Sequence, residues 1–532
     1  MANEEVSFEV IGEFLEGRDP QQYIVGIESA YHVNEVYLIV NDPDTGKRIE
    51  THTYKPFIWL KHDASSYMFQ GNRSSIRNGL KKHNLKIKAL KVDDADGNIP
   101  KRMDEGFKYM ITSNGSYTDI INFTSEAFAY MKSDSKDKVD LYSQKVIPET
   151  RDTDKEVEIR SLFVALAPQE QFLVQTGKRL FKGMDDYNDV HRLQFDLETH
   201  GLTASTDPIF QIGIRDNRGF EEIIEIKSVI EEEINKLGRK PSEDEKNAMD
   251  REKRDSERIA ISRFFDVIDE IKPDIITAFN SEFFDWPYLE RRCERLSIDI
   301  KDIAKTLNPK AKFRRKPSRL KVGSETLEYD QTIMWGYNII DISHTVRKTM
   351  AINSNIKSWG LKYITKFSGI AKANRVYVEG DKIYTTWADK RDYWVNDEDG
   401  TYGLMPDTGE QPENTTKVKG DYIVQRYLSD DLWETEQVDG IYNQATYLVG
   451  KLLPTGYVRS STMGTAGQWK LIMAAWSYEK GLGVPATTKK RDFVGGLSRL
   501  LEVGYAEDVV KLDYAALYPK TQLTWDIFPD LD

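Results

Sequence analysis

The order of apolar segments in the middle of the chain most constrains what it can fold into. Three short apolar stretches come first: one that ends at Asp196, then 209–214 and 222–226. A charged stretch, 240–258, leads into an amphipathic helical pattern, and a fourth apolar stretch follows at 274–279. Three consecutive strands, a helix and another strand differ from the regular alternation of a doubly wound fold. The sequence therefore predicts an α/β domain built on a mixed sheet.

Two carboxylates lie on the first of these strands. In Leu-Gln-Phe-Asp-Leu-Glu (193–198) the side chains alternate, so Asp196 and Glu198 share one face. Burying both acids is costly without a counter-charge. Divalent cations supply that charge, and a pair about 3.5–4 Å apart can stabilise both oxygens of a phosphodiester displacement. Asp196 and Glu198 are thus predicted catalytic metal ligands, with surface or salt-bridged acids as the alternative.

A second acidic motif, Asn-Ser-Glu-Phe-Phe-Asp, follows the fourth strand at 280–285. Asp285 is predicted to lie in the first turns of a helix, near the end of the sheet, and to bind metal with the first pair. Asn280 is predicted to hold the substrate strand, with helix capping as the alternative. Phe283 is predicted to stack against a base.

A third motif lies on an apparent helix at 421–441. Tyr427 and Asp431 are four residues apart and therefore share a helix face. Asp431 is predicted to complete the metal site, and the Tyr427 hydroxyl to orient the attacking water. Asp430 is predicted to face elsewhere. Asp341, after another apolar stretch, is interpreted as a buried, hydrogen-bonded carboxylate rather than a catalytic one.

The three motifs, in this order, resemble the exonuclease motifs of family B DNA polymerases, and most of all those of the tailed-phage replicative enzymes. The matching residues are Asp196 and Glu198, Asn280 and Asp285, and Tyr427 and Asp431. The resemblance implies an RNase H-like fold and 3′→5′ proofreading with Mg²⁺ or Mn²⁺. It also implies primer–template DNA and single-stranded 3′ ends as substrates and a sliding clamp as a partner.

Two later motifs resemble the polymerase part of that family. Asp-Phe-Val-Gly-Gly (492–496) resembles the Tyr-x-Gly-Gly element, in which Gly495 and Gly496 would let the backbone approach DNA; an ordinary turn is the alternative. Residues 509–519 resemble the first palm motif, which implies that Asp513 is a catalytic metal ligand. It also implies that Leu517 and Tyr518 lie beneath the incoming nucleotide sugar.

The second half of a polymerase site does not follow. No Asp-Thr-Asp turn comes after the first palm motif, although two-metal phosphoryl transfer needs that second carboxylate. We expect an N-terminal subunit or fragment of a DNA polymerase, which uses dNTPs only with a complementing C-terminal chain that carries the remaining palm, fingers and thumb. The alternatives are a free-standing 3′→5′ exonuclease whose palm fragment only binds DNA, and a non-catalytic DNA-binding scaffold.

The predicted organisation has four parts. They are a β-rich N-terminal domain (1–190), an RNase H-like exonuclease domain (191–450) with an insertion at about 380–420, a helical connection (451–490) and the start of a palm (491–532).

Composition says more about the cellular compartment of the chain than about what the chain binds. The net charge of -13 does not exclude DNA, because a basic groove can coexist with an acidic exterior. The basic stretch 307–327 is predicted to be either a β-hairpin on a phosphate backbone or a solvated loop. Cys293 is the single cysteine and cannot form an internal disulfide, and no run of about 18 apolar residues occurs. A reducing cytoplasm is expected, that of an infected bacterial host if a phage encodes the chain.

Overall fold

A computed structural model describes residues 8–30, 34–61, 80–93, 97–99, 101–120, 122, 138–140, 145–147, 163–308, 310–323, 325–486, 499, 503–505, 507–510, 512 and 514–525. This part of the chain divides into two compact units, which are described separately. The larger comprises the described residues of Val6–Tyr54 and Pro168–Trp476, and the smaller those of Lys55–Ala167 and Ser477–Asp532. No helix within the described residues is long and apolar enough to cross a membrane.

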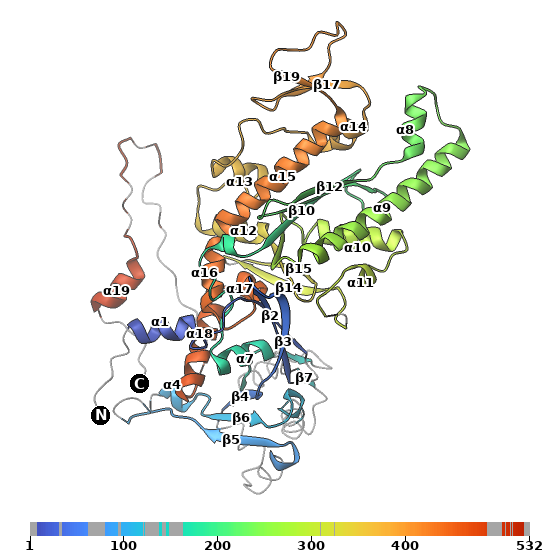
Figure 1. The fold of residues 1–532 in the computed structure, drawn as a ribbon. Coiled ribbons are helices and arrows are strands. Elements are labelled where there is room, and N and C mark those ends of the chain that lie inside the picture. Colours follow the sequence, from blue (N-terminus) through green and yellow to red (C-terminus); the bar gives the residue numbers. More distant parts are fainter. Residues whose placement is uncertain are drawn as a thin grey trace. The chain divides into compact units, whose positions relative to one another are not determined.

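The larger unit is built on a mixed five-stranded sheet of order β12-β11-β10-β13-β16 (Figure 1). The first three strands in the chain are antiparallel neighbours, whereas β10, β13 and β16 run parallel. The predicted mixed sheet is thereby confirmed. The strands are β10 (Arg192–Thr199), β11 (Ile209–Asp216), β12 (Glu221–Glu225), β13 (Ile275–Ala278) and β16 (Asn338–Asp341).

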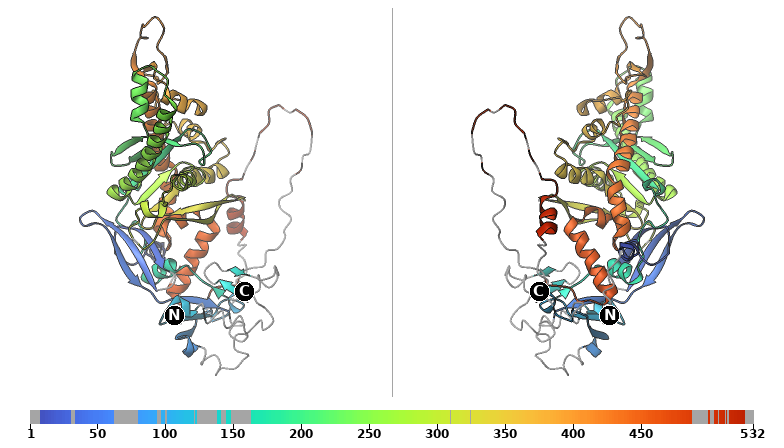
Figure 2. Two further views of the ribbon diagram at one scale, coloured as in Figure 1. Left: turned by 90° about the vertical axis from the view of Figure 1, so that its right-hand side faces the viewer. Right: turned by 90° about the vertical axis from the view of Figure 1, so that its left-hand side faces the viewer.

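Helices cover the sheet on both faces. Leu193, Phe195 and Leu197 of β10 pack against α9 (Glu243–Ile271) and α10 (Asp285–Arg295) in the main apolar core. Most of the charged stretch 240–258 and the apolar pattern after it form the single helix α9, but Ile259, an apolar residue of that pattern, is 70% exposed. The helix buries the face that carries Ile261, Phe264 and Phe265, and Ile259 lies off that face. The long helix α15 (Gly420–Tyr442) packs on β10 and β11 from the other side (Figures 1 and 2).

A three-stranded sheet from the N-terminal region packs against the same domain. Its strands are β1 (Ile24–Ala30), β2 (Glu35–Asp42) and β3 (Gly46–Thr53). Their buried side chains form one core with Ile275 of β13, Ile340 of β16 and Tyr447 of α16 (Gln444–Leu452). Lys47 also donates a hydrogen bond to the carbonyl oxygen of Pro273, and Asn41 donates one to Asp274. This sheet is therefore an integral part of the larger unit.

The basic stretch before residue 327 is a β-hairpin. Strands β14 (Arg314–Val322) and β15 (Glu325–Ile333) pair antiparallel from Arg314↔Ile333 to Val322↔Glu325. Gly323 has a φ of 57°, the left-handed conformation that the turn requires. The β-hairpin is confirmed, and its contact with a phosphate backbone stays a prediction.

The segment predicted as an insertion forms a small antiparallel sheet at the N-terminal end of α15. Its strands are β17 (Asp392–Asn396), β18 (Tyr402–Leu404) and β19 (Thr415–Lys419), in the order β18-β17-β19. The remaining elements of this unit are α1 (Phe8–Glu16), α7 (Pro168–Thr176), η1 (Tyr187–Asp189), α8 (Val229–Lys236), α11 (Ile300–Ile303), α12 (Ile342–Ile352), α13 (Leu361–Phe367), η2 (Gly380–Lys382), α14 (Ile383–Ala388), α17 (Tyr457–Thr462) and most of α18 (Thr465–Lys480).

The smaller unit contains a four-stranded antiparallel sheet of order β5-β6-β4-β9. Its core includes Phe57 and Trp59, and an isolated bridge joins Phe107 to Val484. The described elements are β4 (Phe57–Leu60), β5 (Leu85–Ala89), α4 (Lys101–Asp104), β6 (Tyr109–Ser113), β7 (Lys138–Asp140), β8 (Lys145–Ile147), β9 (Phe163–Val164) and α19 (Leu517–Trp525). The domain boundaries at 190, 450 and 490 stay a prediction.

Candidate active site

The pairing of β10 places its two acids on the polar face of the sheet. The strand continues past Asp196 to Thr199, so Glu198 is also held by backbone pairing with β11. Because alternate residues face opposite sides, Phe195 and Leu197 enter the apolar core and Asp196 and Glu198 face the other way. That other face is the one that α15 covers.

Gly213 lets α15 approach this face closely. It is paired with Asp196 across β10 and β11. A Cβ atom at this position would lie 2.8 Å from Cδ1 of Leu432 and 2.9 Å from Cγ of Leu428, both on α15. Such contacts are shorter than van der Waals distance, so any larger residue would push the helix away from the strand. The glycine thus brings the acid of α15 within reach of the strand acids.

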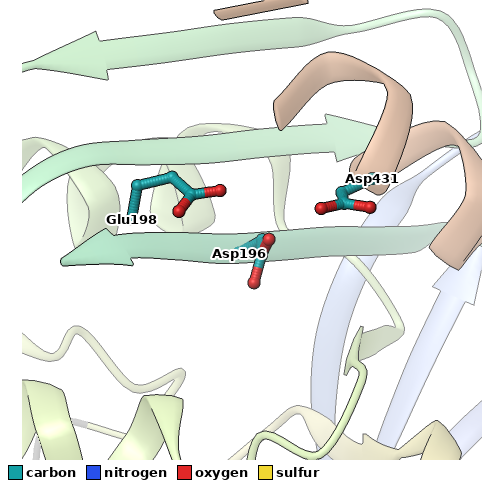
Figure 3. Close-up of side chains that lie close together, drawn as sticks. All are labelled: Asp196, Glu198 and Asp431. Atoms are coloured by element: carbon teal, nitrogen blue, oxygen red, sulfur yellow. The ribbon is translucent and has the colours of Figure 1, made fainter. Parts of the chain in front are cut away.

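Three carboxylates converge at this point. Asp196, Glu198 and Asp431 each offer an oxygen, and these oxygens lie within 4.8 Å of one another (Figure 3). Figure 3 shows the first two extending from one strand and Asp431 reaching down from the helix. Glu198 and Asp431 are buried, and Asp196 is half-buried. The sequence had predicted that these three would lie together.

Asp285 lies next to this cluster. It is the first residue of α10, as predicted, and it is buried, with no hydrogen-bond partner for its Oδ1 atom among the described residues. Burial first, and then the neighbouring charges of Asp196 and Asp341, raise the pKa of Asp285 well above its ordinary value. The fourth predicted acid is therefore electrostatically coupled to the first pair.

The pKa values of the two acids on β10 are raised as well. Burial, followed by the charge of Asp431, raises the pKa of Asp196 to about 7. Burial and the charge of Asp196 raise the pKa of Glu198 well above its ordinary value. Like charges crowded in a desolvated place have this effect, and such clusters are typical of functional sites.

Tyr427 lies beside the cluster, one helical turn before Asp431. Its ring is buried, and its hydroxyl accepts a hydrogen bond from Nζ of Lys362, which also lies 3.5 Å from Oδ2 of Asp431. Burial and the charge of Asp431 raise the pKa of Tyr427 above its ordinary value, so the hydroxyl stays protonated. It can therefore donate a hydrogen bond toward the acids.

Sequence reasoning missed two cations at this site, Lys362 on α13 and Arg375. Arg375 is fully buried and forms an ion pair with Asp431; its Nε atom lies 3.2 Å from Oε1 of Glu434. Neither cation has a motif spacing that links it to Tyr427 or Asp431. The sequence carries no signal for either cation. The burial of Arg375 within an otherwise polar stretch is visible only in the fold.

Asp430 points away from the cluster, as predicted. It accepts hydrogen bonds from Nζ of Lys372, at 3.0 Å, and from the backbone of Val376, at 3.2 Å. The two adjacent acids of α15 thus have different surroundings.

The Asn280 loop differs from a simple helix cap. The N-cap position of α10 is Phe284, without a side-chain cap, so the capping interpretation of Asn280 is wrong. Asn280 instead has a φ of 65°, a left-handed conformation that asparagine tolerates. Its side chain makes no hydrogen bond within the described part of the chain and is free to bind a substrate. Phe283 is 39% exposed, as a stacking platform requires.

Asp341 holds this loop in place. Its Oδ1 atom accepts hydrogen bonds from the backbone of Asn280 and Ser343, both at 2.9 Å, and its Oδ2 atom accepts one from Glu282 at 3.1 Å. The interpretation of Asp341 as a buried, hydrogen-bonded carboxylate is confirmed.

The structure describes only some of the residues predicted to belong to a polymerase site. Asp513, Gly495 and Gly496 lie outside the described residues. Leu517 and Tyr518 begin α19, and both side chains are largely exposed. The strand expected up to Asp513 is not formed at residues 509, 510 or 512. A single strand needs a neighbour to pair with, and none of the described strands pairs there.

The donor set fits divalent cations such as Mg²⁺ or Mn²⁺. These ions prefer oxygen ligands, and carboxylates supply all four candidate positions: Asp196, Glu198, Asp285 and Asp431. The unpartnered Oδ1 of Asp285 and the raised pKa values indicate that the protein alone does not neutralise the cluster. Of the four acids, Arg375 and Lys362 form ion pairs with Asp431 only, which leaves the strand acids without an ion-pair partner among the described residues.

This electrostatic arrangement predicts a pH-dependent cost of folding without metal. The pKa of Asp196 is about 7 in the folded chain, whereas an unfolded aspartate titrates near 3.9. The folded form therefore binds more protons between these values, and stability falls as pH rises from about 4 to 7. We expect Asp196→Asn to be more stable than the wild type by about 4 kcal/mol above pH 7 in EDTA, and by only about 1.5 kcal/mol at pH 5.

Thermal unfolding at both pH values measures that difference. Asp250→Asn, at an exposed position of α9, is the control and should match the wild type at each pH. An equal gain in stability from Asp196→Asn at pH 5 and pH 8 would contradict the raised pKa of Asp196. Excess Mg²⁺ should remove the advantage, because a ligand that binds only the folded form stabilises it.

Comparisons with known proteins find similar sequences over the part of the chain that carries Asp196, Glu198 and Asp285. Residues 135–364 match the sequence model of the exonuclease domain of family B DNA polymerases. A DNA polymerase of Pyrococcus glycovorans is 25% identical over 359 residues, 65% of this chain and 38% of that protein. DNA polymerase 2 of Aeropyrum pernix is 21% identical over 361 residues, again 65% of this chain and 35% of that protein. The structure of the family B DNA polymerase of Pyrobaculum calidifontis matches with a TM-score of 0.48 and 14% identity, covering 88% of this chain and 51% of that one.

The mixed α/β domain is similar in sequence to the exonuclease domain of family B DNA polymerases over residues 135–364. The matched region spans well under half of the two curated relatives. Both relatives are archaeal, and the resemblance to tailed-phage enzymes stays a prediction.

Proposed function

We propose that this chain performs 3′→5′ proofreading for a DNA polymerase by hydrolysing the phosphodiester at the primer 3′ end. The observation that carries the proposal is the convergence of Asp196, Glu198 and Asp431 on one desolvated point, with Asp285 coupled to them. Burying several carboxylates together is costly unless a counter-charge offsets them, which a bound cation would supply. The domain match supports the same activity.

The four acids would hold two divalent ions, Mg²⁺ or Mn²⁺. When bound, such ions activate a water and offset the charge that develops on the phosphate. The chain's own groups do the rest. The Tyr427 hydroxyl would donate a hydrogen bond that orients the attacking water, and Lys362, which donates to the same oxygen, would fix the direction of that hydroxyl. Arg375 holds Asp431 in position through their ion pair.

The substrate strand would be held by the loop after β13. The Asn280 amide would contact the strand from the loop that Asp341 fixes, and the Phe283 ring would stack on a base. Single-stranded binding by one stacking ring and a few polar contacts suits an enzyme that must accept any base sequence. The proposed substrate is therefore a single-stranded or frayed 3′ end.

Nucleotide addition is proposed only with a complementing chain. Asp513 would supply one metal-binding carboxylate, Leu517 and Tyr518 the floor under the sugar, and Gly495 and Gly496 a close contact with DNA. The partner would supply the second carboxylate, the remaining palm, the fingers and the thumb, and with it the dNTP site. A sliding clamp is the further partner that this role implies.

A gel assay of the chain on a 5′-labelled primer–template with Mg²⁺ tests the proposal. We expect stepwise shortening of the primer with or without the four dNTPs, and none in EDTA. A phosphorothioate at the 3′-terminal linkage should slow the first step, which shows the direction of attack. Intact primer in every lane would overturn the nuclease. Extension with dNTPs would show that the chain needs no second palm carboxylate from a partner.

A further inference from the structure

Arg347 on α12 is a half-buried cation without an acidic partner. Within the described part of the chain its guanidinium forms no ion pair and no hydrogen bond, and its Nε atom is buried and unsatisfied. Burial lowers the pKa of Arg347 from its ordinary value. Holding an unpaired charge in this way costs free energy. The position therefore suits an anion that the protein does not itself supply.

Aromatic rings fix the orientation of this guanidinium. Its central carbon lies 3.6 Å from the ring centre of Trp359 and 5.7 Å from that of Phe283. Trp359 in turn stacks on Phe279, with ring centres 6.5 Å apart and planes 12° apart. A guanidinium lying on an indole keeps its N–H edge free, and that edge matches two oxygens of a phosphate. The contact therefore prepares Arg347 to donate two hydrogen bonds.

The same rings belong to the loop that the proposed nuclease uses. Phe279 and Phe283 flank Asn280, so Arg347 lies beside the loop assigned to the substrate strand. Asp341 is the acid that acts on Arg347 most strongly, but its oxygens accept hydrogen bonds from the backbone of Asn280, Glu282 and Ser343. Asp341 consequently organises the loop and leaves the guanidinium unpaired.

The other groups that contact Phe283 from α12 and β15 carry no competing negative charge. His344 meets the ring edge-on at 5.9 Å, and Tyr329 lies 6.0 Å away. Burial lowers the pKa of His344, which keeps it neutral. Apart from Asp341, whose oxygens are occupied by backbone N–H groups, the groups beside Phe283 and Arg347 are therefore aromatic and uncharged, with one exposed ring, as expected for a place where a base and its phosphate lie side by side.

From this geometry we infer that Arg347 binds an internal backbone phosphate of the single-stranded 3′ end while the adjacent base stacks on Phe283. The inference rests on the proposed nuclease function for the direction of the strand. It assigns Arg347 a binding role in which it touches substrate upstream of the bond that is cut. Its ligand is a DNA phosphodiester, independent of base sequence.

A binding experiment with neutralised phosphates tests the assignment. The chain carrying Asp196→Ala and Glu198→Ala is titrated with a labelled single-stranded oligonucleotide, so that no cleavage occurs. Each linkage near the 3′ end is replaced in turn by an uncharged methylphosphonate. We expect one internal linkage whose neutralisation weakens binding about tenfold, as for loss of one charged hydrogen-bonded contact.

Arg347→Gln, added to the Asp196→Ala, Glu198→Ala chain, should show whether Arg347 binds the linkage whose neutralisation weakens binding. We expect it to bind all-phosphate DNA about tenfold more weakly and to lose little more when that one linkage is neutral. The slope of log affinity against log salt should also fall by about 0.7. Arg347→Lys, which keeps the charge but not the flat fork, should lie between the two.

Lys348→Gln is the matched control, because it removes one positive charge from the next position of α12. Its Nζ atom donates to the carbonyl oxygens of Ser461 and Met463, away from Arg347. The affinity of Lys348→Gln should fall at each neutral linkage by the same factor as that of the parent chain. Equal losses for Arg347→Gln with and without the neutral linkage would overturn the inference. The binding experiment needs no cleavage, so it tests the contact between Arg347 and the phosphate even if the nuclease assay fails. The nuclease function and the role of Arg347 can therefore be tested separately.

Discussion

Replacing Asp196 and Glu198 together by alanine is expected to lower the rate of primer shortening by at least about a thousandfold while the chain remains folded. The two side chains form one edge of the carboxylate cluster, and Asp431 and Asp285 cannot hold the proposed ions without them. The transition-state stabilisation lost with the ions amounts to several kcal/mol, and about 4 kcal/mol corresponds to a factor of a thousand. Single-turnover shortening of a 5′-labelled oligonucleotide measures the loss.

A charge-matched control separates this effect from a general change in surface charge. Glu221 and Glu222 lie on β12 at the edge of the same sheet and pair with Arg215 and Arg263. Replacing both by alanine removes two negative charges and should leave shortening near the wild-type rate. DNA binding should persist in both variants, because the acids repel the backbone rather than attract it. Retained cleavage by the Asp196→Ala, Glu198→Ala chain would refute the site.

The strand and helix periods explain why the acids could be found from the sequence. Alternation along 193–198 puts Asp196 and Glu198 on one face of β10, and a spacing of four puts Tyr427 and Asp431 on one face of α15. The mixed topology followed from the order of apolar segments. These features depend on neighbours a few residues apart, and local periodicity records such relations well.

Long-range contacts explain what the sequence could not show. Lys362 and Arg375 reach Tyr427 and Asp431 only because α13 and the following segment fold against α15. The close approach of that helix depends on Gly213, which in the sequence is one small residue within an apolar strand. No local period encodes such relations.

Local signals also misled in two places. Asn280 and Ser281 have the composition of a helix cap, but α10 begins at Asp285 and Asn280 adopts a left-handed conformation. The backbone hydrogen bonds to Asp341, a residue remote in sequence, override the capping preference. Ile259 fits an apolar helical pattern but lies outside the buried face of α9. Tertiary contacts decided both positions.

Asp341→Ala is expected to destabilise the chain by about 3 kcal/mol or more and to disturb the substrate loop. The substitution leaves the backbone N–H groups of Asn280, Glu282 and Ser343 without their acceptor. Each buried donor without a partner costs about 1–3 kcal/mol, and water can satisfy only those that the substitution exposes. Asn280 also loses the bond that supports its left-handed backbone, so the loop should relax toward commoner conformations.

The conservative variant distinguishes loop positioning from stability alone. In Asp341→Asn one oxygen still accepts from Asn280 and Ser343, but the amide nitrogen faces the N–H of Glu282, so one of the three bonds is lost. The loss of stability should be smaller than for alanine, whereas KM for a single-stranded oligonucleotide should rise with little change in kcat, because the loop binds the strand and the acids remain in place. Asp330→Ala, an exposed acid on β15, should stay within about 0.5 kcal/mol of the wild type. Wild-type stability and KM in Asp341→Ala would show that the loop is held by other contacts, and would remove Asp341 from the account of substrate binding.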